Sequence, residues 1–177
     1  MTEVRQGLVQ VYTGNGKGKT TAALGQAIRA LGHGQRVFML QFMKGSKNYG
    51  ELKIASRLAP DFIIEQSGRD EFVDKLNPAP VDIELARQGL ARAKEILASG
   101  EFDMVILDEI NVAVDFGLLP VEEVTAMLKS RPRHIDVVLT GRYAHPDILA
   151  LADLVSDVQE VRHHYHRGVE AREGIEF

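Results

Sequence analysis

Short apolar runs alternate along the whole chain with longer stretches in which apolar residues recur at helical spacing. Runs of β-branched and aromatic residues that stop at glycine or at a charged residue are typical of strands. They predict strands at residues 8–13, 36–42, 62–65, 102–108, 135–140 and 157–161. Apolar stripes, with proline or glycine at their ends, predict helices at residues 24–31, 51–58, 83–97, 121–128 and 146–152.

The order of these elements predicts the fold class. Strands that alternate with helices favour a parallel sheet, and central strands that are apolar almost throughout indicate that helices cover both faces. We therefore expect one α/β domain over residues 1–177, with a mostly parallel central sheet of about six strands. In such folds ligands bind at the carboxyl ends of the strands, so candidate chemistry is expected there.

A glycine-rich loop joins the first predicted strand to the first predicted helix: Thr13-Gly14-Asn15-Gly16-Lys17-Gly18-Lys19-Thr20-Thr21. It ends in Gly-Lys-Thr, as a phosphate-binding loop does, and predicts a P-loop NTPase-like domain. Lys19 would reach the phosphates, and the Thr20 hydroxyl would bind Mg²⁺. The usual pattern has glycine at the position of Thr13. The alternative is a glycine-rich turn without a ligand, which the strand-and-helix context makes the weaker interpretation.

Two further strand ends carry charged residues. The run that ends in Asp108-Glu109 places adjacent carboxylates at the tip of a buried strand, where phosphate-loop proteins hold their metal. Arg142 follows the fifth strand and could pair with a phosphate through two parallel hydrogen bonds. The alternatives are an exposed helix start for the carboxylates and a surface position for the arginine.

Composition narrows the classes of partner. The 21 Lys and Arg residues against 25 Asp and Glu give a net charge of −4, so no bulk positive field attracts nucleic acid. The absence of cysteine excludes a disulfide framework and a thiolate nucleophile. Residues 1–7 show no signal-peptide core, and no apolar run is long enough to span a membrane. We expect a cytoplasmic protein without a membrane or nucleic-acid partner.

Two segments have no clear regular pattern. Residues 67–80 combine glycine, prolines and charged residues, which predicts a functional or mobile loop. The cluster His163-His164-Tyr165-His166 could suggest a transition metal, but neighbouring residues on a strand point apart and no cysteine assists. A solvated tail or a contact to a partner is the favoured interpretation.

Five segments together resemble the ATP:corrinoid adenosyltransferases of the CobA/CobO/BtuR type. They are the glycine-rich loop with its shifted glycine, Gln41-Phe42-Met43-Lys44-Gly45, Leu107-Asp108-Glu109-Ile110-Asn111, Leu139-Thr140-Gly141-Arg142 and Gly174-Ile175-Glu176-Phe177. The resemblance implies transfer of the 5′-deoxyadenosyl group of ATP to the Co(I) of a reduced corrinoid, with release of triphosphate. It also implies that ATP lies in the loop with reversed polarity.

The resemblance also implies roles for individual residues. The ATP-binding set is Gly14, Asn15, Gly16, Lys17, Gly18, Lys19, Thr20, Thr21 and Arg142. Lys19, Arg142 and Glu109 are the residues expected to promote the reaction, and Thr20, Glu109 and Asp108 are expected to hold Mg²⁺, which Mn²⁺ could replace. Because Co(I) is itself the nucleophile, catalysis reduces to positioning the substrates and stabilising the leaving triphosphate.

The corrinoid side rests on fewer residues. Family members carry an aromatic-containing loop after the third strand that helps to displace the lower cobalt ligand, and Phe72 is the candidate here. Met43, Lys44 and Asn111 are expected to line the same face. The family further implies a homodimer and a flavoprotein electron donor. With about seven residues before its first strand, this chain is not expected to supply the N-terminal lid that some members have.

Two other functions share the same loop residues. One is a P-loop kinase or NTPase that acts on a small molecule. The other is a non-catalytic module that binds ATP and delivers a corrinoid, or closes residues 67–80 on a protein partner. The sequence leaves open which corrinoid is the substrate.

Overall fold

The computed structural model describes residues 6–177 and contains one six-stranded sheet. The strands are β1 (Val9–Thr13), β2 (Val37–Phe42), β3 (Phe62–Ser67), β4 (Met104–Asp108), β5 (Asp136–Thr140) and β6 (Leu154–Asp157). Their order across the sheet is β3-β2-β4-β5-β1-β6, and every neighbouring pair is parallel. The predicted α/β class and strand number are confirmed. The expected absence of a signal-peptide core concerns residues 1–7, of which residues 1–5 lie outside the described residues.

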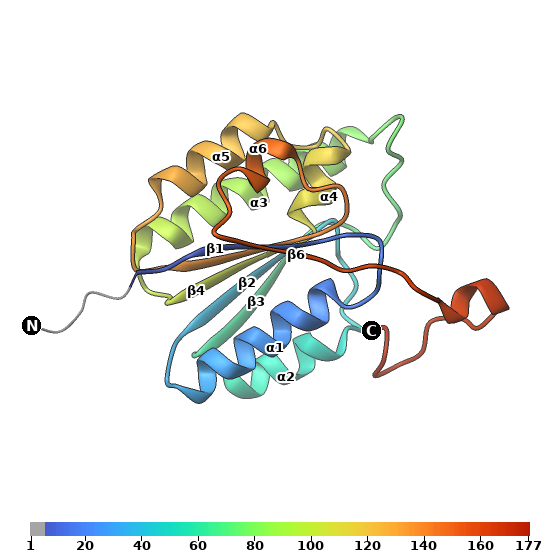
Figure 1. The fold of residues 1–177 in the computed structure, drawn as a ribbon, viewed down its shortest axis with the longest axis horizontal. Helices are drawn as coiled ribbons and strands as arrows, with labels where there is room; N and C mark the ends of the chain where they lie inside the picture. Colours follow the sequence, from blue (N-terminus) through green and yellow to red (C-terminus); the bar gives the residue numbers. More distant parts are fainter. Residues whose placement is uncertain (1–5) are drawn as a thin grey trace, which may run out of the picture.

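Helices cover both faces of the sheet (Figure 1). They are α1 (Lys19–Gly32), α2 (Gly50–Leu58), α3 (Pro80–Ser99), α4 (Ile110–Asp115), α5 (Val121–Ser130) and α6 (Pro146–Leu149), followed by the 3₁₀ helix η1 (His164–Arg167). Helices α1 and α2 lie on one face, and α3 to α6 lie on the other. No helix within residues 6–177 is long and apolar enough to cross a membrane.

Each face of the sheet has its own apolar core because strand side chains alternate between the two faces. On the α3 side, Phe38, Leu107 and Val137 are buried together with residues from α3 to α6. On the α1 side, Met39 and Ile106 pack against alanines of α1. Burial on both faces explains why the central strands read as continuous apolar runs.

Three elements differ from the prediction. The sixth strand covers Leu154–Asp157 rather than residues 157–161, and its residues are all exposed. An edge strand without a buried face gives no hydrophobic signal, so its position is set by pairing with β1, and the Asp153 carboxylate accepts the Val9 N–H at 2.8 Å. Helix α4 was not predicted, since six residues are too few to show a helical period. Helix α6 is also shorter than expected.

Helix α3 packs closely on β3 at Gly89. A Cβ added there would lie 2.4 Å from Ser67 Oγ and 2.9 Å from the Phe42 ring. Ser67 Oγ donates a hydrogen bond to the Leu85 carbonyl, which ties the strand to the same helix. This contact fixes the end of β3, from which residues 68–79 leave toward the site.

We predict opposite effects for alanine at two helical glycines. Gly89→Ala should lower the free energy of unfolding by about 1–3 kcal/mol because the added methyl group overpacks the contact with Ser67 and Phe42. Gly25→Ala, on the exposed face of α1 with no atom near the new Cβ, should raise it by about 0.4–1 kcal/mol. Urea unfolding measures both, and stabilisation by Gly89→Ala would contradict the close packing.

Candidate active site

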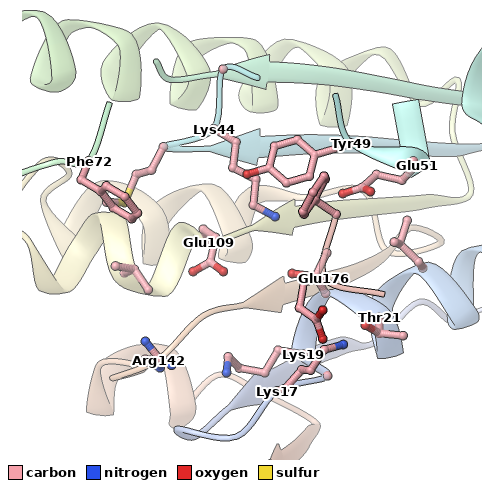
Figure 2. Close-up of a pocket in the computed structure, with 18 of the residues that line it drawn as sticks. Lys17, Lys19, Thr21, Lys44, Tyr49, Glu51, Phe72, Glu109, Arg142 and Glu176 are labelled. Atoms are coloured by element: carbon pink, nitrogen blue, oxygen red, sulfur yellow. The ribbon is translucent and has the colours of Figure 1, made fainter. Parts of the chain in front are cut away.

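A cavity of about 1100 Å³ opens at the carboxyl ends of the strands. The glycine-rich loop and Arg142 border one side, and Lys44 and Phe72 border the other, with Glu109 between them (Figure 2). Residues 174–177 contribute a further part of the wall. Segments far apart in the sequence therefore meet at this edge because all strands are parallel and end on the same side.

Glycines allow the backbone of the glycine-rich loop to turn where other residues would be strained. Gly14 and Gly18 have φ values of 95° and 120°, a region that glycine adopts without steric cost. A Cβ on Gly14 would also lie 2.1 Å from an Asp157 carboxylate oxygen. Thr13, which replaces the usual glycine, accepts a hydrogen bond from the Ala144 N–H at 3.3 Å. The loop is thus fixed between β6 and the segment after β5.

The cations beside this loop are held by backbone carbonyls. Lys19 is buried, and its Nζ donates to the Gly16 carbonyl at 2.7 Å. Burial lowers the pKa of Lys19, and the nearby Arg142 lowers it further. Arg142 donates to the Asn15 carbonyl at 3.4 Å, and Lys17 donates to the Ile175 carbonyl at 3.0 Å. The positive groups thus gather on one side of the cavity although the whole chain is acidic.

Asp108 connects the loop to the ends of three strands. Its carboxylate is fully buried, and Oδ1 accepts hydrogen bonds from the Thr20 and Thr140 hydroxyls, each at 2.7 Å. Oδ2 accepts from Lys44 Nζ, also at 2.7 Å. A buried carboxylate is tolerated only with such partners. Asp108 therefore positions Thr20 and Lys44 and lies beneath the cavity wall.

Lys44 is the cation opposite the glycine-rich loop. Burial alone would lower its pKa, but the attraction and the hydrogen bond of Asp108 outweigh burial and raise the pKa above 10.5. Lys44 also lies over the Tyr49 ring, with Nζ 5.3 Å from the ring centroid. Its ammonium group points to the Asp108 carboxylate and not toward Phe72.

Glu109 is the carboxylate that lines the cavity. Its φ of 62° turns the chain sharply after β4, and its N–H donates to Thr140 Oγ1 at 3.0 Å. Burial raises the pKa of Glu109, as does the neighbouring Asp108, while Lys44, Lys19 and Arg142 oppose that rise. The side chain thus lies among cations from three different segments.

Backbone strain is concentrated at this edge of the sheet. Met43, Glu109 and Tyr143 are the non-glycine residues with positive φ in residues 6–177, at 58°, 62° and 60°. Each follows the end of a strand and lines the cavity. Such conformations cost about 1–3 kcal/mol each and persist only where the surrounding structure imposes them. Their clustering supports this edge as the functional one.

Residues 68–79 form the loop that carries Phe72. The Arg69 guanidinium makes two hydrogen bonds to the Asp82 carboxylate, at 2.8 and 2.9 Å, which tie the start of the loop to α3. Lys75 pairs with Asp115 of α4 at 2.6 Å. Phe72 itself is fully exposed at the cavity rim. The loop is therefore anchored on both sides of an aromatic side chain that has no packing of its own.

The structure brings most of the predicted residues to the cavity. Those that line it are Gly16, Lys17, Gly18, Lys19, Thr20, Thr21, Met43, Lys44, Phe72, Glu109 and Arg142. Gly14 and Asn15 shape the loop without lining the cavity. Asn111 is not brought there: it is fully buried, and its amide donates to the Gly141 carbonyl at 3.3 Å. Its position favours support of the turn before Arg142 over contact with a ligand.

Sequence reasoning did not assign Thr140 or residues 174–177 to the site. Thr140 ends a predicted strand one position before a glycine, so its place beside Asp108 could have been inferred from the parallel arrangement. Residues 174–177 reach the cavity across the glycine-rich loop. The family resemblance includes this segment, but no hydrophobic pattern indicates where it lies.

No group of three or more His, Cys, Asp or Glu side chains within residues 6–177 is placed to hold a metal ion. This includes the histidine cluster, in which His166 bonds to Glu160 at 2.7 Å and the rings of His163 and His164 lie 4.6 Å apart. Thr20 and Glu109 are hard oxygen donors, which fit Mg²⁺ because this ion keeps several waters and uses substrate phosphates as ligands.

The fold and the site define an α/β protein consistent with a phosphate-loop domain. The family model for ATP:corrinoid adenosyltransferase BtuR/CobO/CobP matches residues 5–177. The chain therefore belongs to the ATP:corrinoid adenosyltransferase family and is an enzyme of the transferase class, and membership supports adenosylation of corrinoids.

Three relatives named as corrinoid adenosyltransferases are similar over nearly the whole chain. The chain is 41% identical to the corrinoid adenosyltransferase of Escherichia coli K12 over 172 residues, which cover 97% of this chain and 86% of the relative. The identity is also 41% to corrinoid adenosyltransferase CobA of Salmonella typhimurium LT2, with the same coverage. The Pseudomonas aeruginosa corrinoid adenosyltransferase is 36% identical, over 97% of this chain and 84% of its own length.

We predict that Lys44→Met lowers the free energy of unfolding by about 3–5 kcal/mol at neutral pH, because it leaves the buried Asp108 carboxylate without its cation. The pKa of Lys44 is higher in the folded protein than its ordinary value of 10.5, so the charged side chain stabilises the folded state fully below pH 10.5. This stabilisation is lost as the pH rises through the pKa of Lys44 in the folded protein.

Urea unfolding at pH 7 and above pH 10.5 measures the effect, and the difference between the proteins should shrink at alkaline pH. Lys47→Met, at an exposed position in the same segment, is the control and should change stability by about 0.5 kcal/mol or less. Equal stability of Lys44→Met and the control would contradict the assigned pair.

Proposed function

We propose that this enzyme transfers the 5′-deoxyadenosyl group of ATP to the Co(I) of a reduced corrinoid and releases triphosphate. The observation that carries the proposal is the shape of one continuous cavity. Its cationic side is bordered by the glycine-rich loop and Arg142, and the exposed aromatic ring of Phe72 lies on the opposite side, with Met43 also in the lining. A polyanion and a large macrocycle with apolar faces need these two kinds of surface within one cavity.

ATP binds on the cationic side. Lys19 is already directed back over its own loop at Gly16, where backbone N–H groups and the start of α1 favour phosphate. Lys17 and Arg142 add positive charge on the same side. Burial and the nearby Arg142 lower the pKa of Lys19, and an anionic triphosphate beside the ammonium group would oppose that shift by favouring the charged form.

Thr20 and Glu109 would hold Mg²⁺ together with phosphate oxygens. Asp108 keeps Thr20 Oγ1 in place through its 2.7 Å hydrogen bond, and both of its own oxygens already accept other donors. We therefore assign Asp108 as the positioning carboxylate and Glu109 as the direct ligand. When bound, the metal would neutralise part of the charge on the triphosphate. Mn²⁺ fits the same oxygen donors.

The corrinoid binds against the rim formed by Met43, Phe72 and neighbouring apolar residues. Phe72 is fully exposed while its loop is held by Arg69 and Lys75, which is the arrangement expected of an aromatic side chain that packs on a ligand. We propose that Phe72 contacts the lower face of the corrinoid. Lys44 is assigned to the phosphate and metal side because its ammonium group pairs with Asp108.

The reaction needs no protein nucleophile. The Co(I) electron pair attacks the ribose 5′-carbon, a Co–C bond forms, the bond from that carbon to the phosphate oxygen breaks, and its electrons leave with triphosphate. Cobalt is formally oxidised to Co(III). The protein has to hold the 5′-carbon in line with cobalt and stabilise the leaving polyanion, which the lysines and Arg142 are placed to do.

The family resemblance supports a proposal for the wider setting of the enzyme. We propose a homodimer in the cytoplasm that receives its reduced corrinoid with the help of a flavoprotein electron donor. Active enzyme that sediments as a stable monomer would contradict the dimer.

The test is a product assay with ATP, Mg²⁺ and chemically reduced cobalamin. The expected products are adenosylcobalamin, seen by its absorption spectrum, and triphosphate. ADP or inorganic phosphate as the only product would instead support a kinase or NTPase. Stoichiometric ATP binding without turnover, with Co(I) present, would support a binding module.

We predict that Lys19→Ala weakens ATP binding about 10- to 100-fold, because it removes a charge-assisted contact to phosphate worth about 1.5–3 kcal/mol. Isothermal titration calorimetry with MgATP measures the change. Lys129→Ala, at an exposed position near the end of α5, is the control and should bind like the unchanged protein. Unchanged affinity of Lys19→Ala would contradict the assignment of the loop.

A further inference from the structure

Residues 174–177 form part of the cavity wall, and the proposed function gives them no contact with a substrate. Residues 172–177 fold into a tight turn in which the N–H groups of Ile175 and Glu176 donate to the Arg172 carbonyl, at 3.2 and 2.9 Å. The Ile175 carbonyl accepts from Lys17 Nζ at 3.0 Å. This turn is therefore attached directly to the glycine-rich loop.

Glu176 is the acidic side chain that this turn presents to the cavity. Its carboxylate is 14% exposed, and Oε2 accepts hydrogen bonds from the Arg172 N–H at 2.8 Å and from Arg172 Nε at 3.3 Å. Among the residues that the structure describes, Oε1 has only longer contacts, 3.5 Å to Arg172 Nη2 and 3.8 Å to His164 Nε2. One carboxylate oxygen is thus held in place while the other retains capacity to accept hydrogen bonds.

A carboxylate in a cavity built for a polyanion limits what can lie beside it. Although burial alone would raise the pKa of Glu176, the hydrogen bonds from Arg172 and the charge of His164 outweigh it, and the pKa is lowered. The group stays ionised and repels phosphate. It accepts hydrogen bonds only, so it selects a neutral donor of the nucleotide, either a ribose hydroxyl or the amino group of adenine.

The position of Glu176 favours the ribose. It follows Ile175, whose carbonyl contacts Lys17 of the phosphate-binding loop, so its carboxylate belongs to the part of the nucleotide next to the phosphates. Figure 2 shows Glu176 beside the loop lysines and not at the distant rim with Phe72. The ribose is directly bonded to the triphosphate, whereas adenine lies beyond it.

We propose that Glu176 is a specificity-determining residue that accepts hydrogen bonds from the ribose hydroxyls of ATP, with Arg172 holding its carboxylate. This rests on the proposed function, because it assumes that ATP occupies the cavity. Hydrogen bonds from the ribose would fix the sugar next to the triphosphate, and hence the orientation of its 5′-carbon. A sugar without hydroxyl groups would bury Oε1 of this carboxylate without giving it a short hydrogen bond.

The experiment compares ligands that differ only in the proposed contact. Calorimetry in Mg²⁺ is carried out with ATP, 2′,3′-dideoxy-ATP, inosine triphosphate and inorganic tripolyphosphate. The unchanged protein should bind ATP about tenfold or more tightly than dideoxy-ATP. Glu176→Ala should bind ATP and dideoxy-ATP equally, with tripolyphosphate affinity unchanged within about twofold. Inosine triphosphate, which keeps the ribose but lacks the amino group, should follow ATP.

Glu173→Ala is the matched control. Glu173 lies in the same turn but is exposed and pairs with Lys53 at 3.7 Å, so its loss should leave the preference for ATP intact. Equal binding of ATP and dideoxy-ATP by the unchanged protein would overturn the proposal. So would an equal loss of ATP, dideoxy-ATP and tripolyphosphate in Glu176→Ala, since that pattern indicates that the residue only supports the turn. If Glu176 instead made the protein bind ATP more tightly than inosine triphosphate, the residue would contact the adenine amino group. That result would also overturn the proposal.

Failure of this inference and failure of the proposed function give different results. If the unchanged protein prefers ATP through Glu176 but makes no adenosylcobalamin, the reaction is wrong and the ribose contact stands. If it makes adenosylcobalamin and Glu176→Ala keeps the preference for ATP over dideoxy-ATP, only the ribose contact is wrong.

Discussion

The buried carboxylate of Asp108 is the constraint on which the site depends. Three donors from different segments converge on it at 2.7 Å: Thr20 at the start of α1, Lys44 after β2 and Thr140 at the end of β5. A fully buried charge requires these partners, so the loop and the strand ends cannot move independently. The same contacts leave Glu109, the next residue, as the carboxylate that lines the cavity.

The cavity at the end of the parallel sheet has two chemically different sides. Because all strands end at one edge, the cations of the glycine-rich loop lie across from the apolar rim at Phe72. The chain as a whole carries a net charge of −4, so positive charge is concentrated there and not spread over the surface. The backbone is strained at Met43, Glu109 and Tyr143 because three segments turn sharply toward the same cavity after their strands end.

Fold prediction succeeded where burial imposes a pattern. The central strands, buried on both faces, are near-continuous apolar runs, and strands β1 to β5 were found close to their observed bounds. Prediction was wrong for β6, whose exposed residues carry no periodic signal, and it missed the six-residue α4. These elements are fixed by pairing with β1 and by packing against β5 and β2, which are contacts between segments distant in sequence.

The sequence by itself determined the α/β class, the glycine-rich loop and the adjacent carboxylates at the end of β4, since each depends on a few consecutive residues or on a regular period. Only the tertiary structure decided which predicted residues face the cavity. It placed Asp108 and Asn111 beneath the wall, brought Lys44 to Asp108 and brought Glu176 to the loop. The reason is physical: a buried charge selects its partners by distance in space, and distance in space is set by the sheet, not by the neighbours in the chain.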